Sequence, residues 1–162
     1  MEKIKIGVFG AGRGISMMNY CKSSENAELV AVCDFNEYFL NKQKTEFSNG
    51  NVTYYSDFDN FIKHGMDAVV LANYAHAEYA IKCLNNNINV LSEVLPVQTM
   101  SEAVRLVEAV EKSKAIYCYA ENYCYMEAPK RMKEEYKKGL LGEFEYGEGE
   151  YFHNCESIWP II

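Results

Sequence analysis

The sequence has 162 residues, a size that predicts one principal hydrophobic core and leaves room for only part of a second domain. Hydrophobic residues make up 49% and charged residues 24%, which is typical of folded proteins and excludes disordered or collagen-like chains. The formal net charge of -7 argues against a nucleic-acid partner, because such a surface repels phosphates.

No segment predicts membrane insertion or secretion. Residues 1–9 lack the long apolar stretch of a signal peptide, and no run approaches the roughly 20 residues of a membrane span. We therefore expect a cytoplasmic protein without a membrane partner. The six cysteines are scattered, without Cys-x-x-Cys pairs or nearby paired histidines, so we expect separate thiols and no metal site.

Short β-rich runs alternate with helical patterns along most of the chain. The expected strands are 3–9, 28–33, 52–55, 68–71, 89–92 and 116–120. Runs such as Ala68–Leu71 are continuously apolar, as in parallel strands that helices cover on both faces. The alternation predicts an α/β fold, a doubly wound parallel-sheet Rossmann domain over residues 1–121.

The expected helices fall between these strands. Residues 37–47 give the weakest pattern, because their polar content leaves only a narrow apolar stripe. Positions 77, 80, 81 and 84, and later 103, 106, 107 and 110, are apolar at helical spacing, so each set predicts one face against a sheet. Thr99 with Glu102 has the spacing of a capping box, and Ser56 with Asp59 approximates it.

The pattern changes after Ala120. Pro129 suits the first turn of a helix to about Lys138, and Gly139 and Gly142 supply a stop and a turn. Over residues 143–152, polar residues alternate with aromatic ones, as at the start of a new sheet. We expect residues 122–162 to begin an α+β domain for substrate binding and oligomerisation that is incomplete in an apparently truncated chain.

A glycine-rich turn follows the first expected strand, as a dinucleotide-binding fingerprint requires. It reads Gly10-Ala11-Gly12-Arg13-Gly14-Ile15. Gly10 would permit the tight turn, Gly12 would let the main chain approach a pyrophosphate, and amides at the helix start would face the anion. The third glycine of the fingerprint should stand at position 15, but Gly14 comes one residue early, so we expect looser packing of the helix on the strand. The alternative is a turn that only joins strand to helix.

Asp34 strengthens the cofactor interpretation. It ends the second expected strand, about 20 residues beyond the glycines, where a carboxylate can accept hydrogen bonds from both hydroxyls of an adenosine ribose. Phe35 and Asn36 follow it instead of an arginine, so repulsion of a 2'-phosphate should favour NAD over NADP. The alternative is a surface aspartate that opens a turn.

Two further segments, 71–78 and 90–96, follow the fourth and fifth expected strands. Together with the glycine turn and Asp34, they resemble the Gfo/Idh/MocA family of oxidoreductases, and the resemblance spans the whole chain. It implies hydride transfer between NAD and a hydroxyl-bearing carbon of a sugar or cyclitol. The expected cofactor contacts are Gly10, Gly12, Arg13, Gly14, Ile15, Asp34, Asn73, His76, Glu93 and Asn122.

Val94 departs from the family pattern. The fifth strand of the family ends in Glu-Lys-Pro, whereas this chain has Glu93-Val94-Leu95 and so lacks the lysine that assists proton transfer at the substrate hydroxyl. A branch of the family, the NAD-dependent glycosidases that act on N-acetylgalactosaminides, looks similar in lacking this lysine. In that branch the cofactor transiently takes hydride from sugar C3, and the glycosidic bond then breaks by elimination.

Likeness to that branch implies Tyr151 and His153 as catalytic residues near the sugar. They stand two apart, so on a strand both would face one side. The alternative is an aromatic sheet face that packs on a helix.

Two other interpretations of the chain stay open. It could be a non-catalytic nucleotide-binding or assembly protein, which Val94 and the partial second domain favour, or an inactive truncated fragment. Under the leading interpretation the partner is a small-molecule sugar or cyclitol, and a homo-oligomer can form if the full-length second domain is present.

Overall fold

The computed structural model describes residues 2–47, 51–150, 152, 154 and 156. The chain divides into two compact units, Met1–Glu121 and Asn122–Ile162. Within the described residues, no helix combines the length and the apolar character that crossing a bilayer needs.

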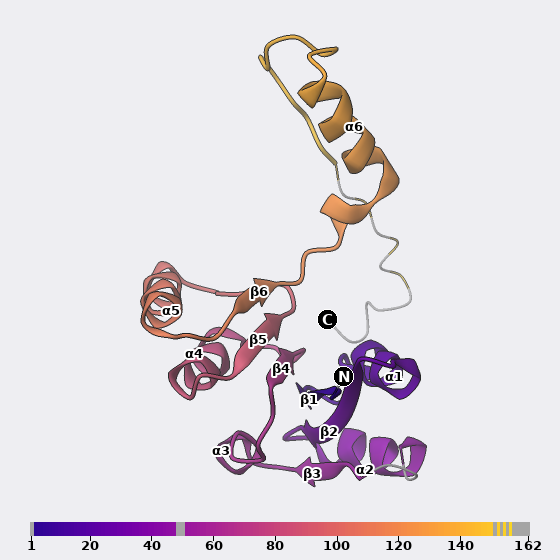
Figure 1. Cartoon of the computed structure of the whole chain (residues 1–162), viewed down its shortest axis with the longest axis vertical. Helices are drawn as coiled ribbons and strands as arrows, with labels where there is room; N and C mark the ends of the chain where they lie inside the picture. The colour runs from indigo at the N-terminus through magenta and orange to yellow at the C-terminus, as the bar shows by residue number, and fades with distance from the viewer. Residues whose placement is uncertain (1, 48–50, 151, 153, 155, 157–162) are drawn as a thin grey trace. The chain divides into compact units, whose positions relative to one another are not determined.

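The first unit is built on a six-stranded sheet with the order β3-β2-β1-β4-β5-β6, in which every neighbouring pair is parallel (Figure 1). The strands are β1 (Ile4–Phe9), β2 (Ala27–Cys33), β3 (Thr53–Tyr55), β4 (Ala68–Leu71), β5 (Asn89–Ser92) and β6 (Tyr117–Tyr119). The predicted doubly wound parallel sheet is therefore confirmed.

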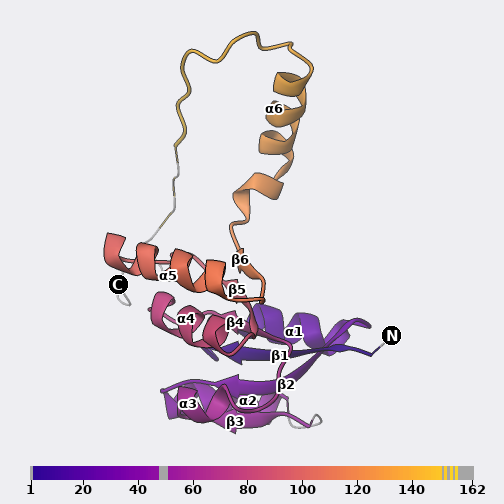
Figure 2. The same cartoon turned by 60° about the vertical axis from the view of Figure 1, so that its left-hand side comes forward.

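Helices cover both faces of this sheet (Figures 1 and 2). They are α1 (Ile15–Ser23) and α2 (Glu37–Glu46) on one face, and α3 (Phe58–Phe61), α4 (Ala77–Asn85) and α5 (Met100–Lys112) on the other. On the first face Met18 and Leu40 pack against the sheet. On the second, the core holds Phe61, Leu84 and Leu106. α4 buries positions 77, 80 and 84 of its predicted apolar stripe. α5 buries Leu106 and Ala109, whereas Val107, which the period places on the buried face, is 56% exposed.

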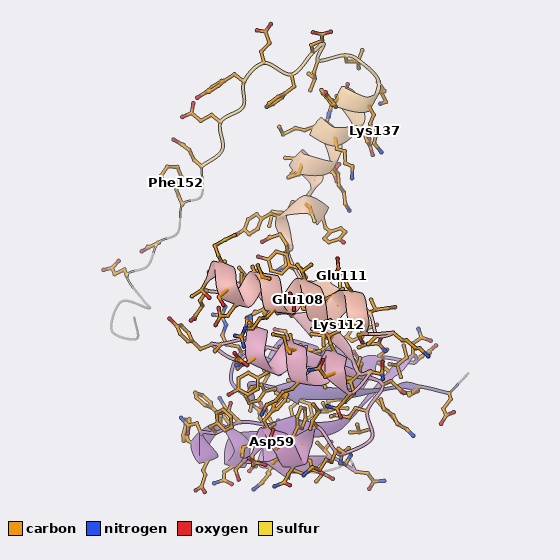
Figure 3. The ribbon with its side chains drawn as sticks, turned by 90° about the vertical axis from the view of Figure 1, so that its left-hand side faces the viewer. Asp59, Glu108, Glu111, Lys112, Lys137 and Phe152 are labelled. Carbon is orange, nitrogen blue, oxygen red and sulfur yellow. The ribbon has the colours of Figure 1, made fainter. Side chains whose placement is uncertain are left out.

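The first residues of α5 and α3 can be compared with the capping signals predicted from the sequence. At α5 the predicted capping box of Thr99 and Glu102 forms. At α3 the cap is Asp57 and not Ser56, because Asp57 has extended backbone angles from which its Oδ1 accepts the Asn60 amide at 2.8 Å. The exposed side of α5 carries the charged residues Glu108, Glu111 and Lys112 (Figure 3) and also exposes Val104 and Val107.

The buried cysteines act as small core groups. Burial raises the pKa of the Cys83 thiol to about 12. Burial, and to a smaller extent the negative charges of Asp34 and Asp57, raises the pKa of the Cys33 thiol to about 12 as well. Both side chains therefore stay protonated near neutral pH and contribute packing rather than reactivity.

The second unit contains a short 3-10 helix, η1 (Tyr123–Tyr125), and α6 (Glu127–Lys137). Pro129 lies in the first turn of α6, and Gly139 and Gly142 have positive φ angles of 75° and 70° in the turn beyond it, as predicted. The strand expected over 143–152 is not formed in the described residues 143–150 and 152. An extended segment becomes a strand only beside a neighbour that accepts its backbone hydrogen bonds, and the described part of this unit supplies none.

Candidate functional site

Four strands end at one level on the carboxyl edge of the sheet. Phe9 pairs with Cys33 on one side and with Leu71 on the other, and Leu71 in turn pairs with Ser92. The residues that leave the sheet together are therefore Gly10, Asp34, Ala72 and Glu93. The strand order reverses between β1 and β4, and open α/β sheets bind their ligands at this kind of switch point.

A cleft of about 850 Å³ opens at this edge. Its walls include the expected cofactor contacts Gly10, Gly12, Arg13, Asp34, Asn73 and Glu93. Gly14, Ile15 and His76 do not line it. Asn122 belongs to the second unit, and Tyr151 and His153 lie outside the described residues.

The glycine turn between β1 and α1 is tightly packed. Gly10 has a φ of 102°, and a Cβ atom there would lie 2.5 Å from the carbonyl carbon of Ala72 in the β4 loop. A Cβ atom on Gly14 would lie 2.4 Å from Cγ1 of Val8 on β1. The expectation of loose packing at the helix start is thus wrong, because Gly14 itself provides the close approach that position 15 of the fingerprint usually provides.

The first turn of α1 leaves amide donors open toward an anion. The N-cap, Gly14, has no side chain to cap the helix. Its carbonyl already accepts hydrogen bonds from the Met17 and Met18 amides, both at 3.1 Å. The amides of Ile15 and Ser16 have no carbonyl one turn earlier in the helix, as at any helix start. Together with the helix dipole, these groups favour negative charge.

Asp34 connects the end of β2 to the glycine turn. Its Oδ2 accepts a hydrogen bond from the Ala11 amide and its Oδ1 accepts one from the Asn36 amide, each at 2.8 Å. A carboxylate has about four lone-pair positions, so acceptor capacity remains on the side that lines the cleft. Asp34 therefore opens a turn, as the alternative interpretation held, and also faces the cleft.

Sequence reasoning missed two residues of α2 that reach the glycine turn. Gln43 is 2% exposed, and its Nε2 donates to the Ala11 carbonyl at 3.1 Å. The Phe39 ring lies beside Gly12, 3.3 Å from where a Cβ atom would stand. One signal was available: position 43 falls on the apolar stripe of Leu40 and Phe47, where a polar residue calls for an explanation.

His76 contacts the loops after β4 and β5, which form the wall of the cleft opposite the glycine turn. It is 3% exposed; its Nδ1 lies 2.7 Å from the Leu95 carbonyl oxygen, and its Nε2 contacts the Asn73 carbonyl oxygen. These carbonyls belong to the loops after β4 and β5. His76 therefore joins the two loops, and the cofactor contact expected of it stays a prediction.

The loop after β5 exposes apolar groups to the cleft. Val94 is 43% exposed and Leu95 63% exposed. Arg13 reaches across from the glycine turn and places its Nε 3.7 Å from Oε2 of Glu93, a pair too exposed to contribute much stability. Among the described residues that line the cleft, Arg13 is the only lysine or arginine.

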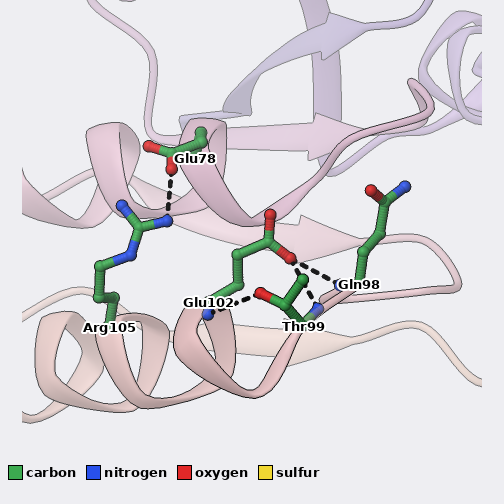
Figure 4. Close-up of polar contacts among 5 residues, drawn as sticks. All are labelled: Glu78, Gln98, Thr99, Glu102 and Arg105. Atoms are coloured by element: carbon green, nitrogen blue, oxygen red, sulfur yellow. Dashed lines mark hydrogen bonds and ion pairs between the residues drawn. The ribbon is translucent and has the colours of Figure 1, made fainter.

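The far end of this loop is held by the capping box of α5 (Figure 4). Oε2 of Glu102 accepts hydrogen bonds from the amides of Gln98 at 2.7 Å and Thr99 at 3.0 Å. These bonds hold the pKa of the Glu102 carboxyl below its usual value, and the bond from the Gln98 amide contributes most to this shift. In the same view Arg105 bonds to Glu78, which ties α5 to α4. Gln98 is thereby fixed at the rim of the cleft.

Comparison with known families gives one match over most of the first unit. Residues 4–121 match the Gfo/Idh/MocA model, described as an oxidoreductase family with an NAD-binding Rossmann fold. The chain is 24% identical to a glycosyl hydrolase family 109 protein of Shewanella amazonensis, over 99% of this chain and 37% of that protein. A second protein of that description, from Shewanella sp. strain ANA-3, is 27% identical with the same coverage. The chain thus spans about 37% of the length of these curated relatives.

Solved structures share the fold. The myo-inositol 2-dehydrogenase of Lactobacillus plantarum matches with a TM-score of 0.80 and 20% identity, over 90% of this chain and 44% of that one. The WlbA dehydrogenase of Bordetella pertussis, solved with NADH and UDP-GlcNAcA, matches with a TM-score of 0.80 and 22% identity, over 87% of this chain and 44% of that one. At these identities the likeness establishes the architecture alone.

Proposed function

Because the chain belongs to the Gfo/Idh/MocA oxidoreductase family, whose fold binds NAD, we propose that the cofactor lies in the cleft at the carboxyl edge of the sheet. The observation that carries this proposal is the level row formed by Gly10, Asp34, Ala72 and Glu93. The row brings a glycine turn and the carboxylates of Asp34 and Glu93 to a single opening.

The cleft suits a dinucleotide in size and chemistry. Its volume falls within the range of about 300–1,000 Å³ that is usual for cofactor sites. Because Gly10 and Gly12 have no side chains, a diphosphate can approach the main chain of the turn closely. The start of α1 offers N–H donors to such an anion. Asp34 keeps acceptor positions for the hydroxyls of a ribose.

The charge beside β2 favours NAD over NADP. A 2'-phosphate would meet the Asp34 carboxylate, and neither Phe35 nor Asn36 supplies a compensating positive charge. Phe35 is 58% exposed and stacks edge-on against Phe9, with ring centroids 5.3 Å apart. It forms an apolar wall next to Asp34 that suits a flat purine ring.

For the whole protein we propose an oxidoreductase that acts on a sugar or cyclitol. Bound NAD supplies a hydride acceptor. Val94 has no titratable atom, so another residue has to take the proton of the substrate hydroxyl. We keep Tyr151 and His153 as the candidates for this task. The myo-inositol 2-dehydrogenase, the WlbA dehydrogenase solved with UDP-GlcNAcA and the relatives named as glycosyl hydrolases support a sugar-like substrate.

NAD-dependent cleavage of a glycoside is the finer form of this proposal. Val94 in place of the family lysine and the names of the curated relatives support it. It predicts NAD-dependent release of p-nitrophenol from p-nitrophenyl N-acetylgalactosaminide, without net formation of NADH. Steady formation of NADH from a sugar or inositol would instead favour a dehydrogenase.

A non-catalytic binding protein is the second candidate. The exposed Val94 and the presence of a single cationic side chain among the described cleft residues favour it. It predicts NAD binding without either reaction, so turnover in either assay excludes it.

Isothermal titration with NAD⁺ and NADP⁺ tests the binding proposal. We expect NAD⁺ to bind more tightly than NADP⁺, and Asp34→Ala to weaken NAD⁺ binding by about tenfold or more, the loss of a hydrogen bond to a charged group. Asp59→Ala is the matched control, because Asp59 pairs with Lys82 on the surface and does not line the cleft. No binding by the folded chain at millimolar NAD⁺ would refute the proposal.

A further inference from the structure

The peptide groups on either side of Ala11 are held from two directions. The Ala11 amide donates to Oδ2 of Asp34 at the end of β2, at 2.8 Å. The Ala11 carbonyl accepts from Nε2 of Gln43 on α2, at 3.1 Å. Ala11 is fully buried; its bond to Gln43 is buried as well, and its bond to Asp34 is partly buried. The centre of the glycine turn is thereby fixed by side chains from two separate elements.

Gln43 occupies a position that favours an apolar side chain. It is 2% exposed and lies between Leu40 and Phe47 on the inner face of α2. Its Oε1 is buried without a hydrogen-bond donor among the described residues. A buried amide with one unpaired atom destabilises a fold, so packing alone does not account for a glutamine here. The hydrogen bond from its Nε2 to the Ala11 carbonyl accounts for a glutamine at this position.

This bond sets the direction of the next amide. The peptide between Ala11 and Gly12 is trans, so its carbonyl and its N–H point in opposite directions. Because the carbonyl points at buried Gln43, the Gly12 N–H points away from α2 and out of the interior. Gly12 lines the cleft and has no hydrogen-bond acceptor among the described residues.

We propose that Gln43 is a positioning residue for diphosphate recognition: by holding the Ala11 carbonyl, it aims the Gly12 amide at the phosphates of the bound dinucleotide. The inference rests on the proposed NAD site and deepens it. Gln43 itself does not line the cleft and acts only through the main chain of the turn.

NMR titrations of the ¹⁵N-labelled full chain with ADP and with adenosine test this role, because only ADP carries the diphosphate. Gln43→Met keeps the size of the side chain and removes the donor. We expect it to raise the Kd for ADP about tenfold and the Kd for adenosine less than about twofold. The Gly12 amide signal, which should shift when ADP binds the wild-type chain, should shift much less in the variant.

Leu40→Ala is the control, because Leu40 is 4% exposed in the same helix and makes no bond to the turn. It should lower the melting temperature without changing the ratio of the two Kd values. Gln43→Glu, whose carboxylate cannot donate, is a second variant and should repeat the loss for ADP. Unchanged ADP binding in both Gln43 variants, or equal weakening of ADP and adenosine, overturns the inference. If the wild-type chain binds neither ligand, the NAD site itself is refuted.

Discussion

On the β1–β2 side of the cleft, hydrogen bonds with Asp34 and Gln43 fix the main chain of the glycine turn. On the β4–β5 side, His76 and the α5 capping box hold two loops whose cleft-facing side chains include the exposed Val94. In the proposed site, the first wall offers backbone groups to the cofactor, and the second offers side chains. Backbone recognition depends on a few required residues, whereas side chains of the second wall can change without altering the fold.

The sharpest test of the first wall is Gly10→Ala. The new Cβ atom would lie 2.5 Å from the Ala72 backbone at a φ of 102°, so both strain and a clash oppose it. We expect the free energy of unfolding to fall by about 3 kcal/mol, measured in urea, with loss of NAD binding. Gly65→Ala is the control: its φ is 81°, but no atom lies within 4 Å, so we expect only the strain, about 1 kcal/mol. Equal losses in the two variants would contradict the packing described for the turn.

His76→Leu tests the link beneath the second wall. It removes the ring contacts that join two loop carbonyls, and we expect a loss of about 2 kcal/mol in the free energy of unfolding and weaker NAD binding. His64→Leu is the control, since it removes a single bond to Tyr55 away from the cleft. It should cost about 1 kcal/mol and leave NAD binding intact. Normal NAD binding by His76→Leu would show that the loops do not need this link.

Val94→Lys tests how permissive the second wall is. Because Val94 is 43% exposed, we expect the free energy of unfolding to change by less than about 0.5 kcal/mol. The NAD affinity should stay within about threefold. Val90→Lys, which buries an ammonium group at a 2% exposed position of β5, should unfold the chain. A strong loss of stability in Val94→Lys would mean that the β5 loop is as constrained as the glycine turn.

The smallest effect concerns pH. The pKa of Glu102 is lowered from the usual 4.5 in the folded chain, so its stabilisation is fully present above that value and is lost as the pH falls through the lower folded pKa. Glu102→Gln should therefore melt below the wild-type chain at neutral pH, and the difference should shrink below pH 4.5. Melting curves across this range provide the test, and a constant difference would argue against a charged cap.

Local patterns were sufficient to predict the sheet. The strand expected at 3–9 is β1 (Ile4–Phe9), and that expected at 116–120 is β6 (Tyr117–Tyr119), because β-rich runs between turn residues mark strands directly, both in the centre of the sheet and at its edge. The glycine turn and Asp34 were recognised for a similar reason, since both follow such runs at once. These signals lie within a few neighbouring residues.

The features that local patterns did not predict arise where distant segments meet. Gln43 contacts a residue 32 positions earlier, and His76 contacts one 19 positions later, so neither role has a local signature. Gly14 was judged against a fixed spacing, although its contact is with Val8 on another element. The alternation over 143–152 has the period of a strand, but a strand also needs a partner, which period alone does not supply.

We propose that main-chain amides of the glycine turn bind the diphosphate of NAD while Asp34 binds the adenosine ribose. A crystal structure of the chain with NAD tests it most directly. We expect a phosphate oxygen within hydrogen-bond distance of the Gly12 amide and ribose hydroxyls on the Asp34 carboxylate. Dinucleotide bound elsewhere, or a cleft closed by Phe39 and Arg13 at saturating NAD, would contradict it.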